Sequence, residues 1–219
     1  MKKAIIFDLD GTLINSLPDI SAAMNKVLVS YGLPSHDETK YKLFTGDGAK
    51  NLALRALGDN KELFDKVYQS YAEEYAKNSR VNTVPYHGIP QLLYELGEAG
   101  IKICVLSNKG HSDVKKVLKY FFPKVQFAYS AGVREGGPVK PDPRAAQEVL
   151  QALALSADEC WYIGDTITDM RCAADAGIPS IAVGWGFQSK QMISQADPDY
   201  FVENVEELRQ LLIKDHKKH

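Results

Sequence analysis

The sequence predicts an α/β protein with a mostly parallel sheet flanked by helices, and with a helical segment inserted after the first strand. Short apolar runs rich in β-branched and aromatic residues recur along the chain, and helical patterns separate them. Such alternation is typical of βαβ units, in which a helix connects two parallel strands. One stretch, residues 16–80, has helical patterns and no convincing strand, which predicts the insertion.

The first strand is predicted at residues 4–7, an apolar run of the kind that is buried on both faces. The insertion follows it, with helical patterns at residues 17–31, 48–57 and 63–77. Three tyrosines recur at helical spacing in the last of these, and we expect them to pack inside the insertion. They are Tyr68, Tyr71 and Tyr75.

The rest of the chain alternates between strands and helices. Each strand run has four to six residues and is bounded by Gly, Ser, Asn, Asp or Pro. We expect strands at residues 101–106, 125–129, 160–163 and 180–183, and helices at 89–99, 113–122, 143–155 and 167–176.

Composition narrows the class of protein. A chain of 219 residues can form one large domain or two unequal ones, and a net charge of −2 lacks the basic excess that marks nucleic-acid binding. No apolar run is long enough for a signal peptide or a membrane span. The three cysteines form no paired motif, so neither disulfides nor zinc are predicted. We expect a cytoplasmic protein; the sequence leaves its oligomeric state open.

Asp8 and Asp10 follow the first predicted strand directly, with Gly11 and Thr12 behind them. Open α/β sheets bind ligands beyond the carboxyl ends of their strands, where this pair would lie. An N-cap or a turn accounts for one aspartate, but two neighbouring carboxylates repel each other unless a cation, a proton or donors offset the charge. The pair therefore favours a catalytic or metal-binding role.

Three further candidate sites lie where a parallel sheet would bring them close to Asp8 and Asp10. Ser107 and Asn108 follow the strand predicted at 101–106, where a hydroxyl either binds an anion or caps a helix. Lys140 stands beside two prolines that stiffen its loop, although a surface lysine is the simpler interpretation for it alone. Asp165 and Asp169 follow the strand predicted at 160–163, and an N-cap explains only Asp165.

Taken together, these residues predict phosphoryl transfer. Four carboxylates, from Asp8, Asp10, Asp165 and Asp169, would meet Lys140 in one cleft. Oxygen ligands of this kind prefer Mg²⁺ to zinc. An anionic substrate, Mg²⁺, a lysine and a carboxylate nucleophile occur together in phosphoryl transfer.

The chain also resembles a known superfamily. The segment Asp8-x-Asp10-Gly11-Thr12, then Ser107, Lys140 and Gly164-Asp165-x-x-x-Asp169, are similar to the four ordered motifs of the haloacid dehalogenase superfamily. Residues 11–20, 45–48 with 55–57, and 184–187 resemble phosphoglycolate phosphatases. The resemblance implies a Rossmann-like catalytic core at 1–15 and 83–219, with an α-helical cap domain at 16–82.

The resemblance also implies roles for these residues. Asp8 would be the nucleophile that forms an aspartyl-phosphate, and Asp10 would act as general acid and then base. Mg²⁺ would be held by Asp8, Asp165 and the Asp10 carbonyl, with Asp169 in a supporting position. The transferring phosphoryl oxygens would be surrounded by Thr12, Ser107, Asn108 and Lys140.

The insertion offers candidates for contact with the leaving group. Gly46, Asp47 and Gly48 form a loop with exposed backbone N–H groups, and Arg55 on the next helix could meet a substrate carboxylate. An ordinary turn and a solvated arginine remain the simpler alternatives.

The predicted function is hydrolysis of a small phosphomonoester similar to phosphoglycolate. The predicted partner is a small phosphorylated metabolite, with no nucleic acid and no membrane. Two alternatives stay open: a sugar-phosphate mutase, which uses the same core residues, and a non-catalytic module that binds a phosphorylated metabolite.

Overall fold

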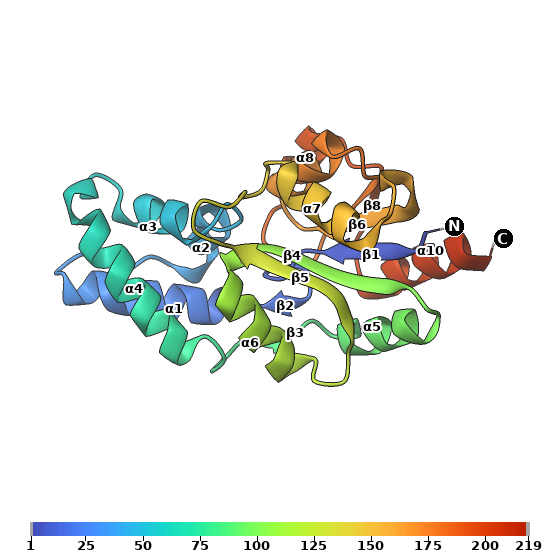
Figure 1. The fold of residues 1–219 in the computed structure, drawn as a ribbon. Coiled ribbons are helices and arrows are strands. Elements are labelled where there is room, and N and C mark those ends of the chain that lie inside the picture. Colours follow the sequence, from blue (N-terminus) through green and yellow to red (C-terminus); the bar gives the residue numbers. More distant parts are fainter. Residues whose placement is uncertain (1, 218–219) are drawn as a thin grey trace.

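A six-stranded parallel sheet forms the centre of the molecule (Figure 1). The structure, a computed structural model, describes residues 2–217. The strand order is β5-β4-β1-β6-β7-β8, and every neighbouring pair is parallel. The strands are β1 (Ala4–Phe7), β4 (Lys102–Gly110), β5 (Phe127–Val133), β6 (Cys160–Gly164), β7 (Ser180–Val183) and β8 (Tyr200–Val202). The predicted α/β class with a mostly parallel sheet is confirmed.

This strand order determines where a ligand can bind. Counted along the chain, the strands of the sheet lie in the order 3-2-1-4-5-6, the order of doubly wound sheets that bind dinucleotides. The direction of winding reverses between β1 and β6, and a crevice opens beyond their carboxyl ends. Asp8 follows β1 and Asp165 follows β6, so the fold brings both to that crevice.

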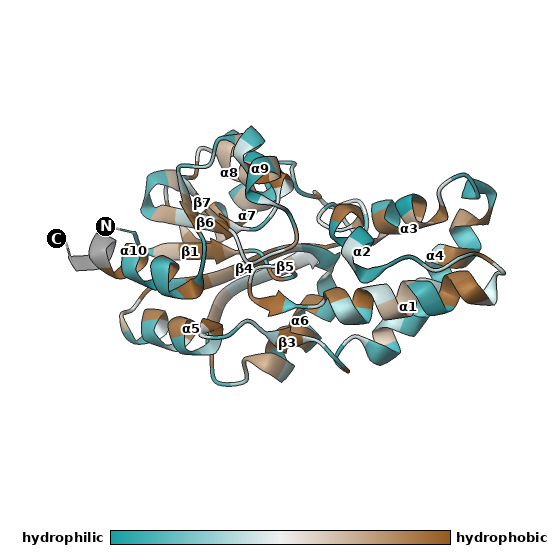
Figure 2. Ribbon diagram, turned by 180° about the vertical axis from the view of Figure 1, so that it is seen from behind, coloured by the Kyte–Doolittle hydropathy of each residue, from teal (hydrophilic) through white to brown (hydrophobic). Residues whose placement is uncertain are grey.

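Helices cover both faces of the sheet (Figures 1 and 2). On one face, Ile5 and Phe7 of β1 pack with α5, α6 and α10; on the other, Ala4 and Ile6 pack with α7 and α8. Burial on both faces explains why the sequence of β1 is a continuous apolar run. The helices are α5 (Ile89–Glu98), α6 (His111–Phe121), α7 (Arg144–Leu153), α8 (Ile167–Asp175), α9 (Lys190–Ile193) and α10 (Val205–Lys217), with short turns η2 (Ala157–Glu159) and η3 (Ser194–Ala196).

Four helices form the insertion and stand at the end of the sheet (Figure 1). They share a hydrophobic cluster distinct from those of the sheet, which Phe187 joins from the loop after β7. The helices are α1 (Leu17–Ser30), α2 (Glu38–Phe44), α3 (Ala49–Leu57) and α4 (Phe64–Asn78), with a turn η1 (Lys61–Leu63). No helix within residues 2–217 is long and apolar enough to span a bilayer.

The chain enters and leaves the insertion through a two-stranded antiparallel ribbon. Ile14 of β2 (Ile14–Asn15) pairs with Pro85 of β3 (Val84–Pro85). This ribbon was not predicted from the sequence, because two-residue strands carry no periodicity. The division into units at 1–15 with 83–219 and at 16–82 stays a prediction.

Three predicted strands differ from the observed ones at their ends. β4 continues to Gly110, where it pairs with Val133 of β5, so Ser107 and Asn108 lie within the strand rather than after it. β5 begins at Phe127 and ends at Val133, where residues 125–129 were predicted, and β6 runs one residue further than predicted, to Gly164. Pairing between neighbouring strands sets these ends, and the sequence of one strand does not reveal it.

Asp19, in the first turn of α1, ties the start of the insertion to its end. Its buried carboxylate accepts hydrogen bonds from the backbone N–H groups of Val81, Asn82 and Thr83 at 2.8 to 3.1 Å. The Thr83 hydroxyl, at 2.7 Å, and the Asn82 amide, at 3.1 Å, also donate to it. Although burial opposes the charge, these donors hold the pKa of Asp19 below its ordinary value.

Asp19→Asn is expected to lower the free energy of unfolding by about 2 kcal/mol. The NH₂ group of asparagine would replace one carboxylate oxygen, so the backbone N–H groups that now donate to that oxygen would lose their acceptor. Since the folded-state pKa is lowered, the carboxylate stabilises the fold at neutral pH, and this contribution is lost as pH falls through that pKa. Urea denaturation at pH 7 and at pH 3 measures both effects. Exposed Asp59→Asn is the control, and an equal loss in the two variants would contradict the prediction.

Candidate active site

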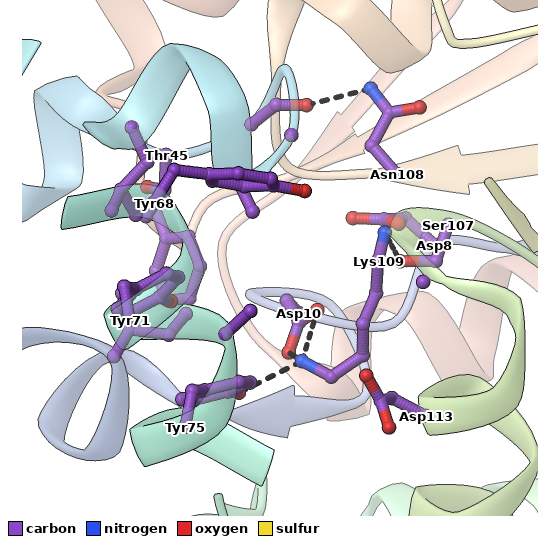
Figure 3. Close-up of a pocket in the computed structure, with 18 residues that line it drawn as sticks. Asp8, Asp10, Thr45, Tyr68, Tyr71, Tyr75, Ser107, Asn108, Lys109 and Asp113 are labelled. Carbon is purple, nitrogen blue, oxygen red and sulfur yellow. Dashed lines mark hydrogen bonds and ion pairs between the residues drawn. The ribbon is translucent and has the colours of Figure 1, made fainter. Parts of the chain in front are cut away.

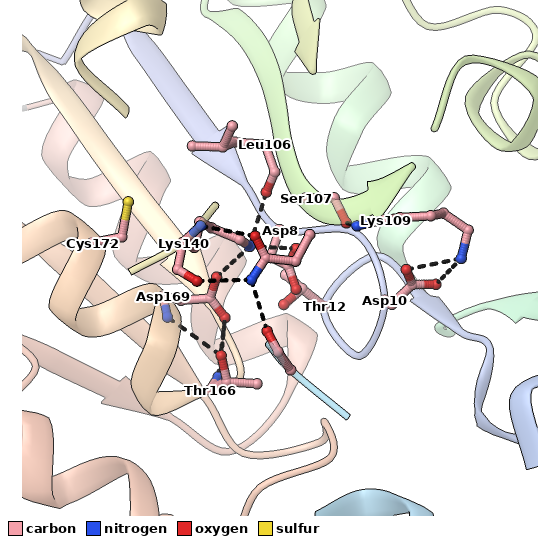
Figure 4. A network of polar contacts seen from close by, with 12 residues as sticks. Asp8, Asp10, Thr12, Leu106, Ser107, Lys109, Lys140, Thr166, Asp169 and Cys172 are labelled. Atoms are coloured by element: carbon pink, nitrogen blue, oxygen red, sulfur yellow. Dashed lines mark hydrogen bonds and ion pairs between the residues drawn. The ribbon is translucent and has the colours of Figure 1, made fainter. Parts of the chain in front are cut away.

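Lys140 lies at the centre of a buried ionic network between two aspartates (Figure 4). Its ammonium donates to Asp8 Oδ1 at 2.7 Å, to Asp169 Oδ1 at 2.6 Å and to the Leu106 carbonyl at 3.0 Å. Because an ammonium has three N–H groups, all of its donors are used within the protein. Burial opposes the charge, but the carboxylates of Asp169 and Asp8 raise the pKa of Lys140 above its ordinary value.

Asp8 is held in place by both its backbone and its side chain. Its N–H donates to the Ile163 carbonyl of β6 at 2.8 Å, which fixes the chain as it leaves β1. Its carboxylate is 9% exposed. Burial raises the pKa of Asp8 to about 7, against the opposing effect of Lys140.

Asp165 is a fully buried carboxylate without a cationic partner among the described residues. Its oxygens accept hydrogen bonds from the Thr12 hydroxyl at 3.0 Å and from the Phe187 N–H at 2.8 Å. Burial and the nearby Asp8 raise the pKa of Asp165 well above its ordinary value. A buried carboxylate with only neutral donors marks a place where a cation would bind favourably.

Glycines allow the chain to pass close to these carboxylates. A Cβ atom at Gly11 or at Gly186 would overlap the Asp165 side chain, and one at Gly164 would overlap Asp169. Gly11 also has φ +94°, a conformation that other residues rarely adopt. These three positions therefore accept only glycine without displacing a carboxylate of the site.

Asp169 has two partners, Lys140 and Thr166, of which Thr166 was not predicted from the sequence. The N-cap of α8 is Thr166, not Asp165, and Thr166 forms a capping box with Asp169. The Asp169 Oδ2 accepts a hydrogen bond from the Thr166 hydroxyl at 2.7 Å, while Oδ1 accepts from Lys140. Capping thus accounts for Asp169 and leaves Asp165 without a structural explanation, the reverse of the expectation.

Three of the four predicted carboxylates converge. Oxygens of Asp8, Asp165 and Asp169 lie within 4.8 Å of one another. Together with the ammonium of Lys140, these three carboxylates leave two uncompensated negative charges in a buried space when all are ionised. Mg²⁺ carries two positive charges and prefers oxygen ligands, so the donor set fits this ion. The side chain of Asp10 is not part of this group.

Asp10 points instead toward the insertion, where it pairs with Lys109 (Figures 3 and 4). Both of its oxygens lie 2.9 Å from the Lys109 ammonium, and Oδ1 also accepts a hydrogen bond from the Ser16 hydroxyl at 2.6 Å. Lys109 donates in turn to the Tyr75 hydroxyl on α4 at 2.8 Å. No role was predicted for Lys109 from the sequence, although it stands beside Ser107 and Asn108.

Asn108 links the two loops that border the site. Its amide donates to the Gly46 carbonyl of the insertion at 3.1 Å and to the Lys140 carbonyl at 3.0 Å. Its oxygen accepts from the Lys140 N–H at 2.9 Å. Asn108 therefore connects a loop of the insertion to the loop that carries Lys140.

A pocket of about 180 Å³ lies between the sheet and the insertion (Figure 3). Several residues predicted for the site line it: Asp8, Asp10, Gly46, Gly48, Ser107 and Asn108. Thr12 does not, because its hydroxyl is directed to Asp165. Neither do Asp47 and Arg55, which pair with each other through two hydrogen bonds of 2.5 and 2.6 Å.

The chain is similar to known proteins over most of its length. The sequence profile of the family described as haloacid dehalogenase-like hydrolase matches residues 5–183. A phosphoglycolate phosphatase of Rhodospirillum rubrum is 32% identical over 203 residues, covering 89% of this chain and 84% of that protein. One of Psychrobacter arcticus is 29% identical over 222 residues, covering 97% and 96%.

A solved structure has the same fold. A protein of Lactobacillus delbrueckii subsp. bulgaricus, provisionally described as a phosphoglycolate phosphatase, superimposes with a TM-score of 0.90 at 28% identity. The match covers 97% of this chain and 99% of that one.

Proposed function

This chain belongs to the haloacid dehalogenase-like hydrolase family, and from that premise we propose that it is a Mg²⁺-dependent phosphatase that hydrolyses a small phosphomonoester. The observation that carries the proposal is the convergence of Asp8, Asp165 and Asp169 around a buried space with a deficit of positive charge. Phosphoglycolate is the substrate in the names of the relatives, and it is the first ester to assay.

Asp8 is the proposed nucleophile. Its Oδ1 is bound to Lys140, and the residue also lines the pocket, so its other oxygen is the candidate to attack phosphorus. The attack forms a bond between an Asp8 oxygen and phosphorus and breaks the bond to the leaving alkoxide. Water then hydrolyses the aspartyl-phosphate and restores the carboxylate.

Asp10 is the proposed general acid and base. It would give a proton to the leaving oxygen in the first step and take one from water in the second. Its position on the wall of the same pocket as Asp8 supports this role, and the contacts with Lys109 and Ser16 fix its side chain there. Ser107 is buried on the same wall and is a candidate donor to the phosphoryl oxygens.

A divalent cation would be held by Asp8 and Asp165, and Asp169 would orient Lys140 beside it. When bound, the ion neutralises the charge of the phosphoryl group so that an anionic ester can approach Asp8. We also propose two domains, a catalytic core at 1–15 with 83–219 and a cap at 16–82. The cap would close over the ester.

Phosphate release from a panel of phosphomonoesters tests the proposal. We expect turnover with Mg²⁺, none in EDTA, and recovery when Mg²⁺ is returned. Asp165→Asn is expected to raise the Mg²⁺ concentration for half-maximal rate by at least tenfold, because it removes charge from the ion's ligands. Asp59→Asn serves as the matched control. Full activity in EDTA would contradict the proposed metal.

The same assay separates the alternatives. A sugar-phosphate mutase would consume its substrate without releasing an equal amount of inorganic phosphate. A binding module would hold phosphate esters without hydrolysing any of them.

A further inference from the structure

One wall of the pocket is formed by aromatic side chains. Tyr68, Tyr71 and Tyr75 come from one face of α4, at spacings of three and four, and line the space opposite Ser107 and Asp8 (Figure 3). The remainder of this wall is apolar and comprises Ile20, Ala49, Leu52, Ala72 and Phe187. Because Asp8 lies across from it, this wall is where the leaving group of an ester would lie.

The pocket offers no free positive charge to a leaving group. Among the described residues that line it, Lys109 is the single cation, against the carboxylates of Asp8, Asp10 and Asp113. The three N–H groups of Lys109 are matched by the two oxygens of Asp10 and the hydroxyl of Tyr75. A carboxylate on the leaving group would therefore meet no unused cation in this pocket.

Arg55 does not supply the missing charge. Its guanidinium donates to both oxygens of Asp47 and to the Phe44 carbonyl, and neither Arg55 nor Asp47 lines the pocket. The carboxylate of a glycolate ester would thus find no free cation among the described residues of the pocket.

Two tyrosine hydroxyls of the same wall have no hydrogen-bond partner in the described part of the chain. Tyr71 is only 4% exposed, and no residue within 2–217 bonds to its hydroxyl. The Tyr68 ring extends from α4 toward the side of Ser107 and Asp8, and its hydroxyl is likewise unpaired among these residues (Figure 3). A buried polar group without a partner is costly, so the Tyr71 hydroxyl, with that of half-buried Tyr68 on the same wall, favours a ligand with polar atoms beside an apolar body.

We propose that the leaving group is a neutral alcohol that carries a ring, and that the ring packs on the tyrosines of α4. A cavity of about 150 Å³ is enough to bind benzene, so the 180 Å³ here has room for one small ring. Aromatic rings stack on tyrosine faces, and the hydroxyls of Tyr68 and Tyr71 bind polar atoms at the ring edge. The inference rests on the proposed function: hydrolysis breaks the phosphorus–oxygen bond and releases this alcohol with its proton.

Three primary alkyl esters with comparable leaving groups provide the test: benzyl phosphate, ethyl phosphate and phosphoglycolate. We expect kcat/KM to be at least about tenfold higher for benzyl phosphate than for phosphoglycolate, because ring burial is favourable and a carboxylate finds no free cation in the pocket. Ethyl phosphate should lie between them. A preference for phosphoglycolate over both other esters would overturn the inference.

Variants of the wall test its role. Tyr68→Leu removes an aromatic face and a hydroxyl, and should reduce the ratio of benzyl to ethyl turnover about three- to tenfold. Tyr94→Leu is the matched control, because Tyr94 is 55% exposed on α5, away from the pocket. An unchanged ratio in Tyr68→Leu would contradict the proposed contact.

A binding measurement separates this inference from the proposed function. Calorimetry with the non-hydrolysable benzylphosphonate and phosphonoacetate in the presence of Mg²⁺ needs no turnover. We expect benzylphosphonate to bind at least about tenfold more tightly. If it does so while no ester is hydrolysed, the proposed function fails and the ring preference stands; tighter binding of phosphonoacetate overturns the preference.

Discussion

Asp8→Asn is expected to lower kcat by roughly four orders of magnitude or more, because an amide is a poor nucleophile and no other carboxylate shares its position. Asp165 is directed to Thr12 and Phe187, Asp169 is held by Thr166 and Lys140, and Asp10 points to Lys109. The measurement is phosphate release under saturating ester and Mg²⁺, on protein whose fold is checked by circular dichroism.

Asp59→Asn is the control for this change, since Asp59 is exposed and lies outside the site. It should retain the rate of the unmodified protein. A kcat for Asp8→Asn within tenfold of that rate would contradict the nucleophile assignment.

Lys140→Met is expected to lower the free energy of unfolding by about 3–5 kcal/mol in EDTA, because it leaves two buried carboxylates without their shared cation. Lys140 is almost inaccessible, and so are its partners Asp8 and Asp169. Added Mg²⁺ should recover part of the loss, since the ion would bind the same carboxylates. Urea denaturation with and without Mg²⁺ measures both effects, and phosphate release should fall as Asp8 loses its orientation.

Lys116→Met is the matched control. Its ammonium pairs with Asp113 at the surface, where the Lys116 side chain is 61% exposed, and such a pair contributes below about 1 kcal/mol. Equal losses of stability in the two lysine variants would contradict the account of Lys140.

The sheet and the positions of its carboxylates were predictable because both follow from local patterns. Apolar runs mark strands, and residues directly after parallel strands meet at one edge of the sheet. Asp8 and Asp165 were therefore expected to converge although 157 positions separate them, and oxygens of Asp8, Asp165 and Asp169 lie within 4.8 Å. Lys140 was placed in the same cleft by the charge balance of the four carboxylates, since its loop alone indicated only stiffness.

The directions of individual side chains were not predictable. Thr12 was expected to face a phosphoryl group, but the tight turn at Gly11 directs its hydroxyl to Asp165. Arg55 was considered as a ligand for a carboxylate, but it pairs with Asp47, eight positions earlier in the loop before α3. Such choices depend on which partner the fold brings nearest.

Contacts between the insertion and the sheet could not be predicted from the sequence either. Lys109 reaches Tyr75 across 34 positions, and this contact exists only because α4 lies over the end of β4. The tyrosines were expected to pack the insertion, and Tyr71 and Tyr75 do belong to its hydrophobic cluster. Their second role on the pocket wall arises from the position of the whole insertion, which no local spacing encodes.

The account depends most on Asp8 facing a phosphoryl group beside one magnesium ion. A crystal structure of the protein with Mg²⁺ and beryllium trifluoride, which mimics a phosphoryl group on a carboxylate, tests it directly. We predict electron density joining beryllium to an oxygen of Asp8, with Mg²⁺ ligated by Asp8 and Asp165. Magnesium bound elsewhere, or beryllium trifluoride attached to another residue, would contradict the central claim.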